Sequence, residues 1–201
     1  MKVKSFVFIS LLLVQSPALF TQVLTDVARC KELTWYGIDF TQARFIGFSR
    51  EELKSYNLKD CSYSNLSEDD KSLIRKSYGK KSLKVETLLS QFRNDSTNCI
   101  DLASDKVYNL NFEKIVKIVD EYKIEGLGYG VLGVVESVEK VTNSIFIWIV
   151  YLDNSTGKII SSKRYTGCGW AMNNRLGDFY SIKGIKLIIK LSGKDLQRYS
   201  K

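Results

Sequence analysis

Histidine is absent from all 201 residues of the chain. Imidazole is the commonest general base and metal ligand in proteins, so its absence excludes Ser-His-Asp catalysis, Cys-His catalysis and zinc sites that use histidine. Proline occurs once, at Pro17. A content of 44% hydrophobic and 26% charged residues excludes the collagen-like, low-complexity and disordered classes. It predicts one globular domain, or at most two small ones, and the chain is long enough to bury a full core.

The chain also lacks an apolar run of the roughly 20 residues that a membrane-spanning helix needs. The apolar run at 6–14 follows two lysines, and Ser16 and Ala18 are small residues at positions −3 and −1 of a cleavage site. We therefore expect residues 1–18 to be a secretory signal peptide. A secreted or periplasmic chain without a transmembrane segment follows, and a retained membrane anchor is the alternative.

Positive charge exceeds negative charge, with 30 basic and 22 acidic residues and a formal net charge of +8. Removing residues 1–18 takes two lysines and leaves 28 basic residues against 22 acidic ones, a net charge of +6. Such a balance serves solubility, attraction to anionic envelope polymers, or nucleic-acid binding. The lysines are scattered and form no basic stripe with aromatics, which argues against nucleic acid.

The four cysteines, Cys30, Cys61, Cys99 and Cys168, contain no CxxC pair. This spacing supports neither a zinc ribbon nor a thioredoxin-like redox site. An exported chain with four cysteines permits two disulfides in three connectivities. Cys61 and Cys99 flank one helical region and are the favoured pair, with buried free thiols as the alternative.

The first half of the mature chain predicts strands followed by short helices. Segments 33–38 and 43–48 are rich in aromatic and β-branched residues, which favour strands. Ser49 has the S-x-x-E spacing of a capping box, and the acids after Ser67 suit the start of a second helix that Gly79 ends.

Further helices are predicted by apolar residues at helical spacing. They cover residues 83–93, the segment after the capping residue Asn111 as far as Tyr122, and residues 176–191. The apolar face of the segment that follows Asn111 is expected to lie on a sheet.

Three successive strands are expected at 128–137, 144–152 and 158–165. The last two are joined by the turn residues 153–157, and 145–152 is apolar throughout, as in a central strand buried on both faces. We therefore predict one α+β domain over residues 19–201. Its sheet is expected to be mainly antiparallel with helices packed on one face, and the chain is expected to end strand-strand-strand-helix.

Gly128, Gly130 and Gly133 match the G-x-G-x-x-G pattern, and Asp153 lies 20 residues further on. A dinucleotide site needs a strand before this pattern and a helix that opens within it, because the helix N-terminus holds the pyrophosphate. Here a helix precedes the glycines and a strand follows. Glycines that allow close packing within a strand are the preferred interpretation, and no cofactor is expected.

Candidate binding residues cluster in one loop. Trp170, Asn173, Asn174 and Arg175 offer an aromatic platform, two amides and a guanidinium, which suit sugar or carboxylate recognition. Asp39, at the end of the first strand, is added as a further binding position. The alternative is that this loop has only a structural role, with a tryptophan that covers the sheet edge and an arginine in solvent.

Residues 35–47, which begin Trp-Tyr-Gly-Ile-Asp-Phe, resemble the first strand of a family of exported Bacteroidota proteins that starts with a Gly-Leu-Asp-Phe-Ser-like segment. The stretch 109–169 is similar too, with a Gly-rich strand that ends in Val-Val-Glu-Ser and a strand that closes with Arg-Tyr-Thr-Gly. The resemblance covers about half of the mature chain and implies an exported envelope protein. It implies no reaction.

Three functions remain as hypotheses. The first is a non-enzymatic envelope module that binds a protein or a glycan through the 170–175 loop. The second is a His-free hydrolase or transferase that uses carboxylates such as Asp39 and Glu136. The third is a redox protein with a reactive thiol, for which Cys168 lacks an evident base.

Overall fold

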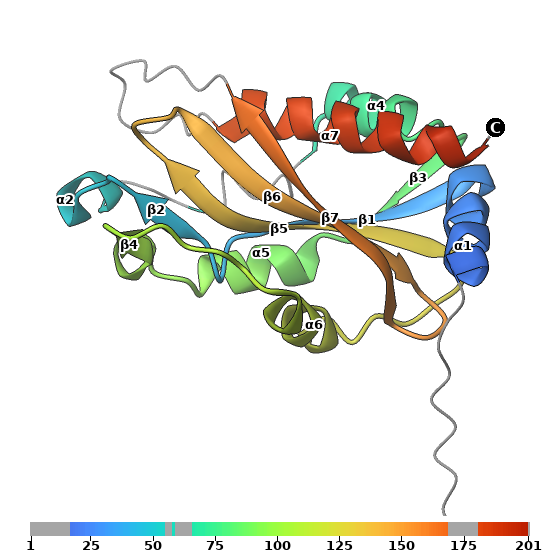
Figure 1. The fold of residues 1–201 in the computed structure, drawn as a ribbon, viewed down its shortest axis with the longest axis horizontal. Helices are drawn as coiled ribbons and strands as arrows, with labels where there is room; N and C mark the ends of the chain where they lie inside the picture. Colours follow the sequence, from blue (N-terminus) through green and yellow to red (C-terminus); the bar gives the residue numbers. More distant parts are fainter. Residues whose placement is uncertain (1–16, 55–57, 59–65, 169–180, 201) are drawn as a thin grey trace, which may run out of the picture.

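The computed structural model describes residues 17–54, 58, 66–168 and 181–200, which form one sheet between two layers of helices (Figure 1). Helices α4 (Glu68–Ser77) and α7 (Ser181–Gln197) lie on one face, and α5 (Leu88–Asp95) and α6 (Phe112–Glu121) lie on the other. The remaining helical elements are α1 (Pro17–Arg29), α2 (Arg50–Leu53), η1 (Cys99–Leu102) and η2 (Arg198–Ser200). The strands are β1 (Glu32–Asp39), β2 (Arg44–Ile46), β3 (Ser82–Val85), β4 (Ala103–Ser104), β5 (Tyr129–Glu139), β6 (Ser144–Asp153) and β7 (Lys158–Cys168).

The prediction of a mainly antiparallel sheet is wrong, because the sheet contains both parallel and antiparallel pairings. Among the described strands, four of the six pairings are parallel, namely β1 with β3, β1 with β5, β2 with β4 and β2 with β5. Only β5–β6 and β6–β7 are antiparallel. The three last strands do form the expected meander, but its first strand, β5, also receives two strands from the beginning of the chain along its other edge.

The expectation that the helices pack on one face is also wrong, because the two faces of the sheet carry separate cores. One core includes Ile74 of α4 and Ile185 of α7, and the other includes Ile115 and Val119 of α6. Parallel strands need crossover connections, and these supply helices to both faces. As predicted, α6 lies on the sheet with its apolar stripe, although Phe112 at its start is 53% exposed.

The predicted helix starts are confirmed. Ser49 and Ser67 each accept a hydrogen bond from the backbone N–H three residues later and complete a capping box, and Asn111 caps α6 through Lys114 N. Helix α4 ends at Ser77, and Gly79 follows with a φ of +66°, a conformation that favours glycine. Capping by Ser and Asn and the turn at Gly involve only residues a few positions apart, so these helix boundaries can be predicted from the sequence.

Residues 82–85 form a strand, so the predicted helix over 83–93 is wrong in its first part. Leu83 and Val85 pair in parallel register with Leu33 and Trp35 of β1. The helical part begins only at Leu88. Pairing with a strand 50 residues earlier therefore overrides the local helical spacing.

Helix α1 is held against the domain by a buried lysine. The Lys80 ammonium donates hydrogen bonds to the carbonyl oxygens of Val27 at 2.6 Å, Ala28 at 2.9 Å and Cys30 at 3.2 Å. These carbonyls belong to the last turn of α1 and the residue after it, where the helix itself supplies no further backbone donors. Burial of the ammonium lowers the pKa of Lys80 below its ordinary value. This contact positions Leu24, which faces the pocket described below.

Helix α7 approaches its neighbours closely at two glycines. A Cβ atom at Gly184 would lie 2.7 Å from Cγ2 of Ile145, and one at Gly193 would lie 2.2 Å from the carbonyl oxygen of Ser77. The first contact places α7 on the sheet and the second places it against α4. The predicted final helix is present from Ser181 and extends beyond the expected end at 191 to Gln197, and residues 176–180 of the prediction lie outside the described residues.

Candidate functional site

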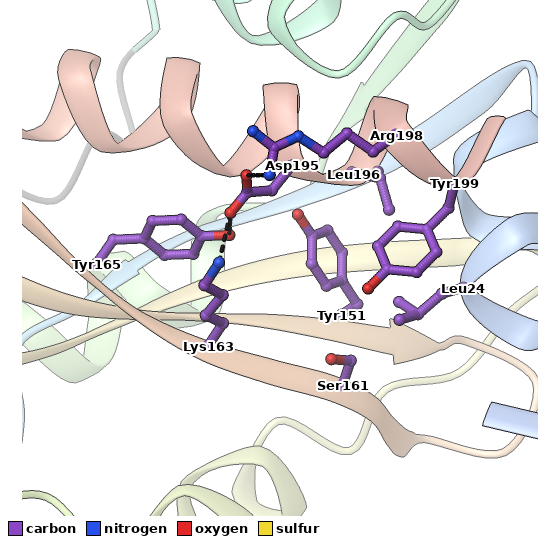
Figure 2. Close-up of a pocket in the computed structure, with 9 residues that line it drawn as sticks. All are labelled: Leu24, Tyr151, Ser161, Lys163, Tyr165, Asp195, Leu196, Arg198 and Tyr199. Atoms are coloured by element: carbon purple, nitrogen blue, oxygen red, sulfur yellow. Dashed lines mark hydrogen bonds and ion pairs between the residues drawn. The ribbon is translucent and has the colours of Figure 1, made fainter. Parts of the chain in front are cut away.

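The described pocket with the greatest variety of polar side chains lies where β7, η2 and α1 meet beside the C-terminal end of α7 (Figure 2). It has a volume of about 200 Å³. We call it the tyrosine pocket, and its lining residues are Leu24, Tyr151, Ser161, Lys163, Tyr165, Asp195, Leu196, Arg198 and Tyr199.

Strand alternation explains how β7 supplies three of these side chains. Ser161, Lys163 and Tyr165 are two residues apart, so they lie on the same face of the sheet, the face that α7 covers. Tyr151 of β6 is registered opposite Ser161 and extends the same surface. Tyr199 and Leu24 close the pocket from η2 and α1 (Figure 2).

Asp195 is the centre of the polar side of the pocket. Its Oδ2 accepts hydrogen bonds from the Lys163 ammonium at 2.6 Å and from the Tyr165 hydroxyl at 3.1 Å, and Arg198 lies 3.2 Å from Oδ1. Figure 2 shows the three groups converging on this carboxylate. The hydrogen bond from Lys163 is the largest cause that holds the pKa of Asp195 below its ordinary value, and burial raises the pKa of Tyr165 above its own.

Tyr151 lines the pocket and packs against a second buried tyrosine, Tyr78, which lies outside the lining. The Tyr151 hydroxyl donates to the Ser192 carbonyl oxygen at 3.2 Å, and the rings of Tyr78 and Tyr151 pack edge to face with centroids 6.4 Å apart. Burial raises the pKa of Tyr151 well above its ordinary value, so this phenol stays protonated. Tyr151 therefore contributes an uncharged surface to the pocket.

Two hydroxyl groups of the pocket have no hydrogen-bond partner among the described residues. These are Ser161 and Tyr199, and Tyr199 is 40% exposed. The side chains of Lys163 and Arg198 are 60% and 69% exposed, so both remain open to solvent although they contact Asp195. Aromatic walls with a few available polar groups are typical of ligand sites.

Asp39, predicted as a binding residue, is completely buried and fully hydrogen-bonded. Its Oδ2 accepts from Arg93 Nε at 2.7 Å and from the Tyr122 hydroxyl at 2.9 Å, and its Oδ1 accepts from the backbone N–H and the hydroxyl of Thr41 at 2.8 and 2.6 Å. Arg93 also bonds Glu121. The carboxylate thus joins β1, α5 and α6 and faces no open space.

Glu136, the second acid of the hydrolase hypothesis, is held in the same way. Its Oε1 accepts from Arg164 at 3.0 and 2.7 Å, its Oε2 accepts from Trp148 Nε1 at 2.8 Å, and it is 1% exposed. The Arg164 guanidinium in turn lies over the ring of Phe146, 4.1 Å from its centroid. Asp39 and Glu136 therefore each form an ion pair with a different arginine.

A second pocket, of about 450 Å³, lies between β3, α5 and the segment after α6, and its lining includes Tyr36, Tyr122, Leu88 and Glu125. Its phenols are already used, because Tyr36 donates to Asn154 at 3.1 Å and Tyr122 to Asp39. Burial is the main reason that the pKa of Tyr36 rises to about 12. Neither Asp39 nor Glu136 lines this pocket or the tyrosine pocket.

The G-x-G-x-x-G segment lies in and before strand β5, and no helix opens within it. A Cβ atom at Gly130 would lie 2.3 Å from Cε2 of Tyr36, and one at Gly133 would lie 2.4 Å from Cδ1 of Ile38. These glycines let the side chains of the neighbouring strand β1 cross β5. Their role is packing, and the arrangement has no helix N-terminus for a pyrophosphate.

Trp170, Asn173 and Arg175 lie outside the described residues, so this part of the predicted site stays a prediction. Cys30, Cys99 and Cys168 are free thiols, which means that the favoured Cys61–Cys99 disulfide is not formed; Cys61 itself is outside the described residues. Burial raises the pKa of Cys99 to about 11, which makes it an unreactive thiol. Within the described part of the chain, Asp, Glu and Cys form no cluster that could hold a metal ion.

Sequence reasoning missed the tyrosine pocket. One signal was available, because Ser161, Lys163 and Tyr165 alternate along a predicted strand and so share a face. Asp195, Arg198 and Tyr199 follow 30 or more residues later, and only the packing of α7 and η2 brings them to that face.

The chain matches no family model and no curated protein sequence. Among solved structures, the LpoB C-terminal domain from Salmonella enterica is similar at 13% sequence identity, with 75% of this chain and 96% of that chain covered. The TM-score is 0.25, which is too low for this likeness to establish a common fold or function. None of the described helices has the length and apolar character needed to cross a membrane.

Proposed function

We propose that the protein is an exported envelope protein that acts as a non-enzymatic binding module, with the tyrosine pocket as its ligand site. The carrying observation is the pair of available hydroxyls, Ser161 and Tyr199, in an aromatic recess whose exposed rim carries Lys163 and Arg198. Such a recess can bind a ligand through ring contacts and hydrogen bonds.

The state of the acids supports binding over hydrolysis. General acid–base catalysis needs a carboxyl group that reaches a substrate and exchanges a proton with it. Asp39 and Glu136 are each enclosed with an arginine, and the Asp195 carboxylate of the pocket already accepts from Lys163 and Tyr165.

The features of residues 1–18 and the resemblance of residues 35–47 to exported proteins support the envelope location. The partner classes remain a protein or a glycan. Trp170, Asn173 and Arg175 stay as predicted additional contacts.

A site-specific photo-cross-linker tests this function in the cells that produce the protein. The cross-linking residue replaces Ser161 inside the pocket, and a control chain carries it at Lys117, which is exposed on α6. We expect an adduct from position 161 that the control does not give and that Tyr199→Ala weakens at least severalfold. Mass spectrometry then assigns the adduct as protein or glycan. Equal labelling at both positions, or none at 161, would contradict the proposal.

A further inference from the structure

Strand β7 is an open edge of the sheet. It pairs with β6, and within the described residues it pairs with no other strand. An edge strand presents alternate N–H and C=O groups with no ladder partner, and an added strand can bind them. From Ser161 to Cys168 the register with β6 is continuous, and the one irregularity lies before Ser161. Eight residues of β7 therefore present a regular template.

The tyrosine pocket lies beside this edge. Ser161, Lys163 and Tyr165 belong both to β7 and to the pocket lining (Figure 2). In a strand added to β7, alternate side chains project to the face that α7 covers. One of them would thus lie next to the pocket, against the aromatic rings of Tyr165 and Tyr199.

The exposed charges along this edge are positive. Lys158 is exposed, the side chains of Lys163 and Arg164 are 60% and 39% exposed, and Arg198 is 69% exposed at the end of the pocket. The acids that pair with them are less accessible, with Asp195 at 25% and Glu136 at 1%. The edge therefore favours an acidic partner.

A second copy of the chain is a poor occupant for the same reason. Antiparallel pairing of two β7 strands would bring lysines and arginines of both copies onto one ribbon, and like charges in cross-strand positions are destabilising. We propose that β7 is a docking edge for an extended acidic segment of a partner protein, which adds a strand to the sheet and places an apolar or aromatic side chain in the tyrosine pocket. This inference rests on the proposed role of the pocket.

Synthetic peptides test the pairing directly. The probe is an N-acetylated, C-amidated octapeptide in which glutamate alternates with phenylalanine or valine, titrated into the ¹⁵N-labelled mature chain. Two isomers carry N-methyl groups at the odd or at the even positions, which removes the N–H donors from one side of the peptide. Because only one side pairs with β7, we expect one isomer to bind at least tenfold more weakly and the other to bind like the parent, with amide shifts along β7.

Charge and specificity are tested with matched controls. Lys158→Glu should weaken binding severalfold at low salt and less at high salt, whereas Lys117→Glu, the same change on exposed α6, should not. A probe with lysine in place of glutamate should bind at least tenfold more weakly. Sedimentation of the free chain should show a monomer, and a β7-dependent dimer would overturn the choice of partner.

The outcomes separate this inference from the proposed function. If both N-methylated isomers bind like the parent while Tyr199→Ala weakens binding, the pocket binds peptides without strand addition and only the inference fails. If no acidic peptide binds but the position 161 adduct proves to be a glycan, the inference fails and the binding function stands. If no peptide binds and the pocket gives no adduct, both fail.

Discussion

At the scale of single residues, the buried ion pair of Asp39 and Arg93 argues against a catalytic role for Asp39 in hydrolysis. Asp39 is fully buried and the Arg93 side chain is 13% exposed, so both charges have left water. Such a pair is stable only while every hydrogen bond is made, and loss of one partner leaves a buried charge without compensation. The residue that the sequence suggests as reactive is thus a structural one.

We predict that Asp39→Asn or Arg93→Gln alone lowers the free energy of unfolding by about 3–5 kcal/mol. Arg93→Gln leaves the buried Asp39 carboxylate without its guanidinium, and Asp39→Asn removes the buried anion from Arg93, which keeps only the exposed Glu121. The double variant should cost clearly less than the sum of the two single variants, because it removes both charges. Urea denaturation of the four proteins gives this coupling. Additive losses would show that the two side chains do not depend on each other.

The second residue of interest is Asp195 in the tyrosine pocket, because its lowered pKa makes the stability of the folded chain depend on pH. The pKa of Asp195 in the folded chain lies below the ordinary 3.8, mainly because Lys163 donates to it. A carboxylate with a lowered pKa stabilises the folded state above its unfolded pKa, and this contribution is lost as the pH falls through its folded pKa.

We therefore predict that Asp195→Asn lowers the free energy of unfolding near pH 7 and that the difference from wild type shrinks as the pH falls below about 4. Denaturation at a series of pH values measures this convergence. Asp105→Asn, an exposed loop carboxylate, is the control and should differ little from wild type at any pH. A difference for Asp195→Asn that stays constant into acid would contradict the role of its charge.

At the scale of elements, the position of α7 is set at two glycines, where the helix comes closer to its neighbours than a larger residue would allow. Gly193 lies against the Ser77 backbone of α4, and Gly184 lies against Ile145 of β6. Glycine in a helix interior costs about 0.5–1 kcal/mol relative to alanine, so its presence at both points indicates a packing requirement. This packing carries Asp195 and η2 to the tyrosine pocket.

We predict that Gly193→Ala lowers the free energy of unfolding by about 1–3 kcal/mol, because the new methyl group meets backbone atoms and α7 has to move. Gly184→Ala should cost less, since its methyl group meets one side-chain methyl group of Ile145 at 2.7 Å, whereas a methyl group at Gly193 meets backbone atoms of Ser77 at 2.2 and 2.5 Å. Urea denaturation compares the two variants. A Gly193→Ala chain as stable as wild type or more stable would mean that α4 and α7 tolerate a wider separation.

Other elements show why local patterns succeed at helix ends and fail in strands that pair in parallel. The caps at Ser49, Ser67 and Asn111 depend on residues three positions apart, and all three were predictable. Residues 82–85 were not, because their strand exists through pairing with β1, and nothing within the segment itself encodes that partner.

At the scale of the whole molecule, α1 links the expected processing of the chain to the tyrosine pocket. The helix spans Pro17–Arg29, so cleavage after Ala18 would remove two of its residues and leave Leu24, which lines the pocket, in place. The lysine contact at the C-terminal end of α1 would also remain. Processing and pocket formation are therefore compatible.

We predict that the protein isolated from the cell envelope begins at Leu19, because Ser16 and Ala18 fit the −3 and −1 positions of the cleavage site. Intact-mass measurement and N-terminal sequencing test this. Ala18→Arg should block cleavage and leave the chain at its full mass. A wild-type chain that retains residues 1–18 in the envelope would favour the membrane-anchor alternative instead.

The sequence by itself determined the chemistry that the protein lacks, its helix caps and the meander of its last three strands, because composition and contacts within a few residues decide these features. Only the tertiary structure decided that β1 and β2 join β5 in parallel, that helices cover both faces, and that Asp39 meets Arg93. It also assembled the tyrosine pocket from α1, β6, β7, α7 and η2. These contacts join residues tens of positions apart, and the packing of the whole chain selects them.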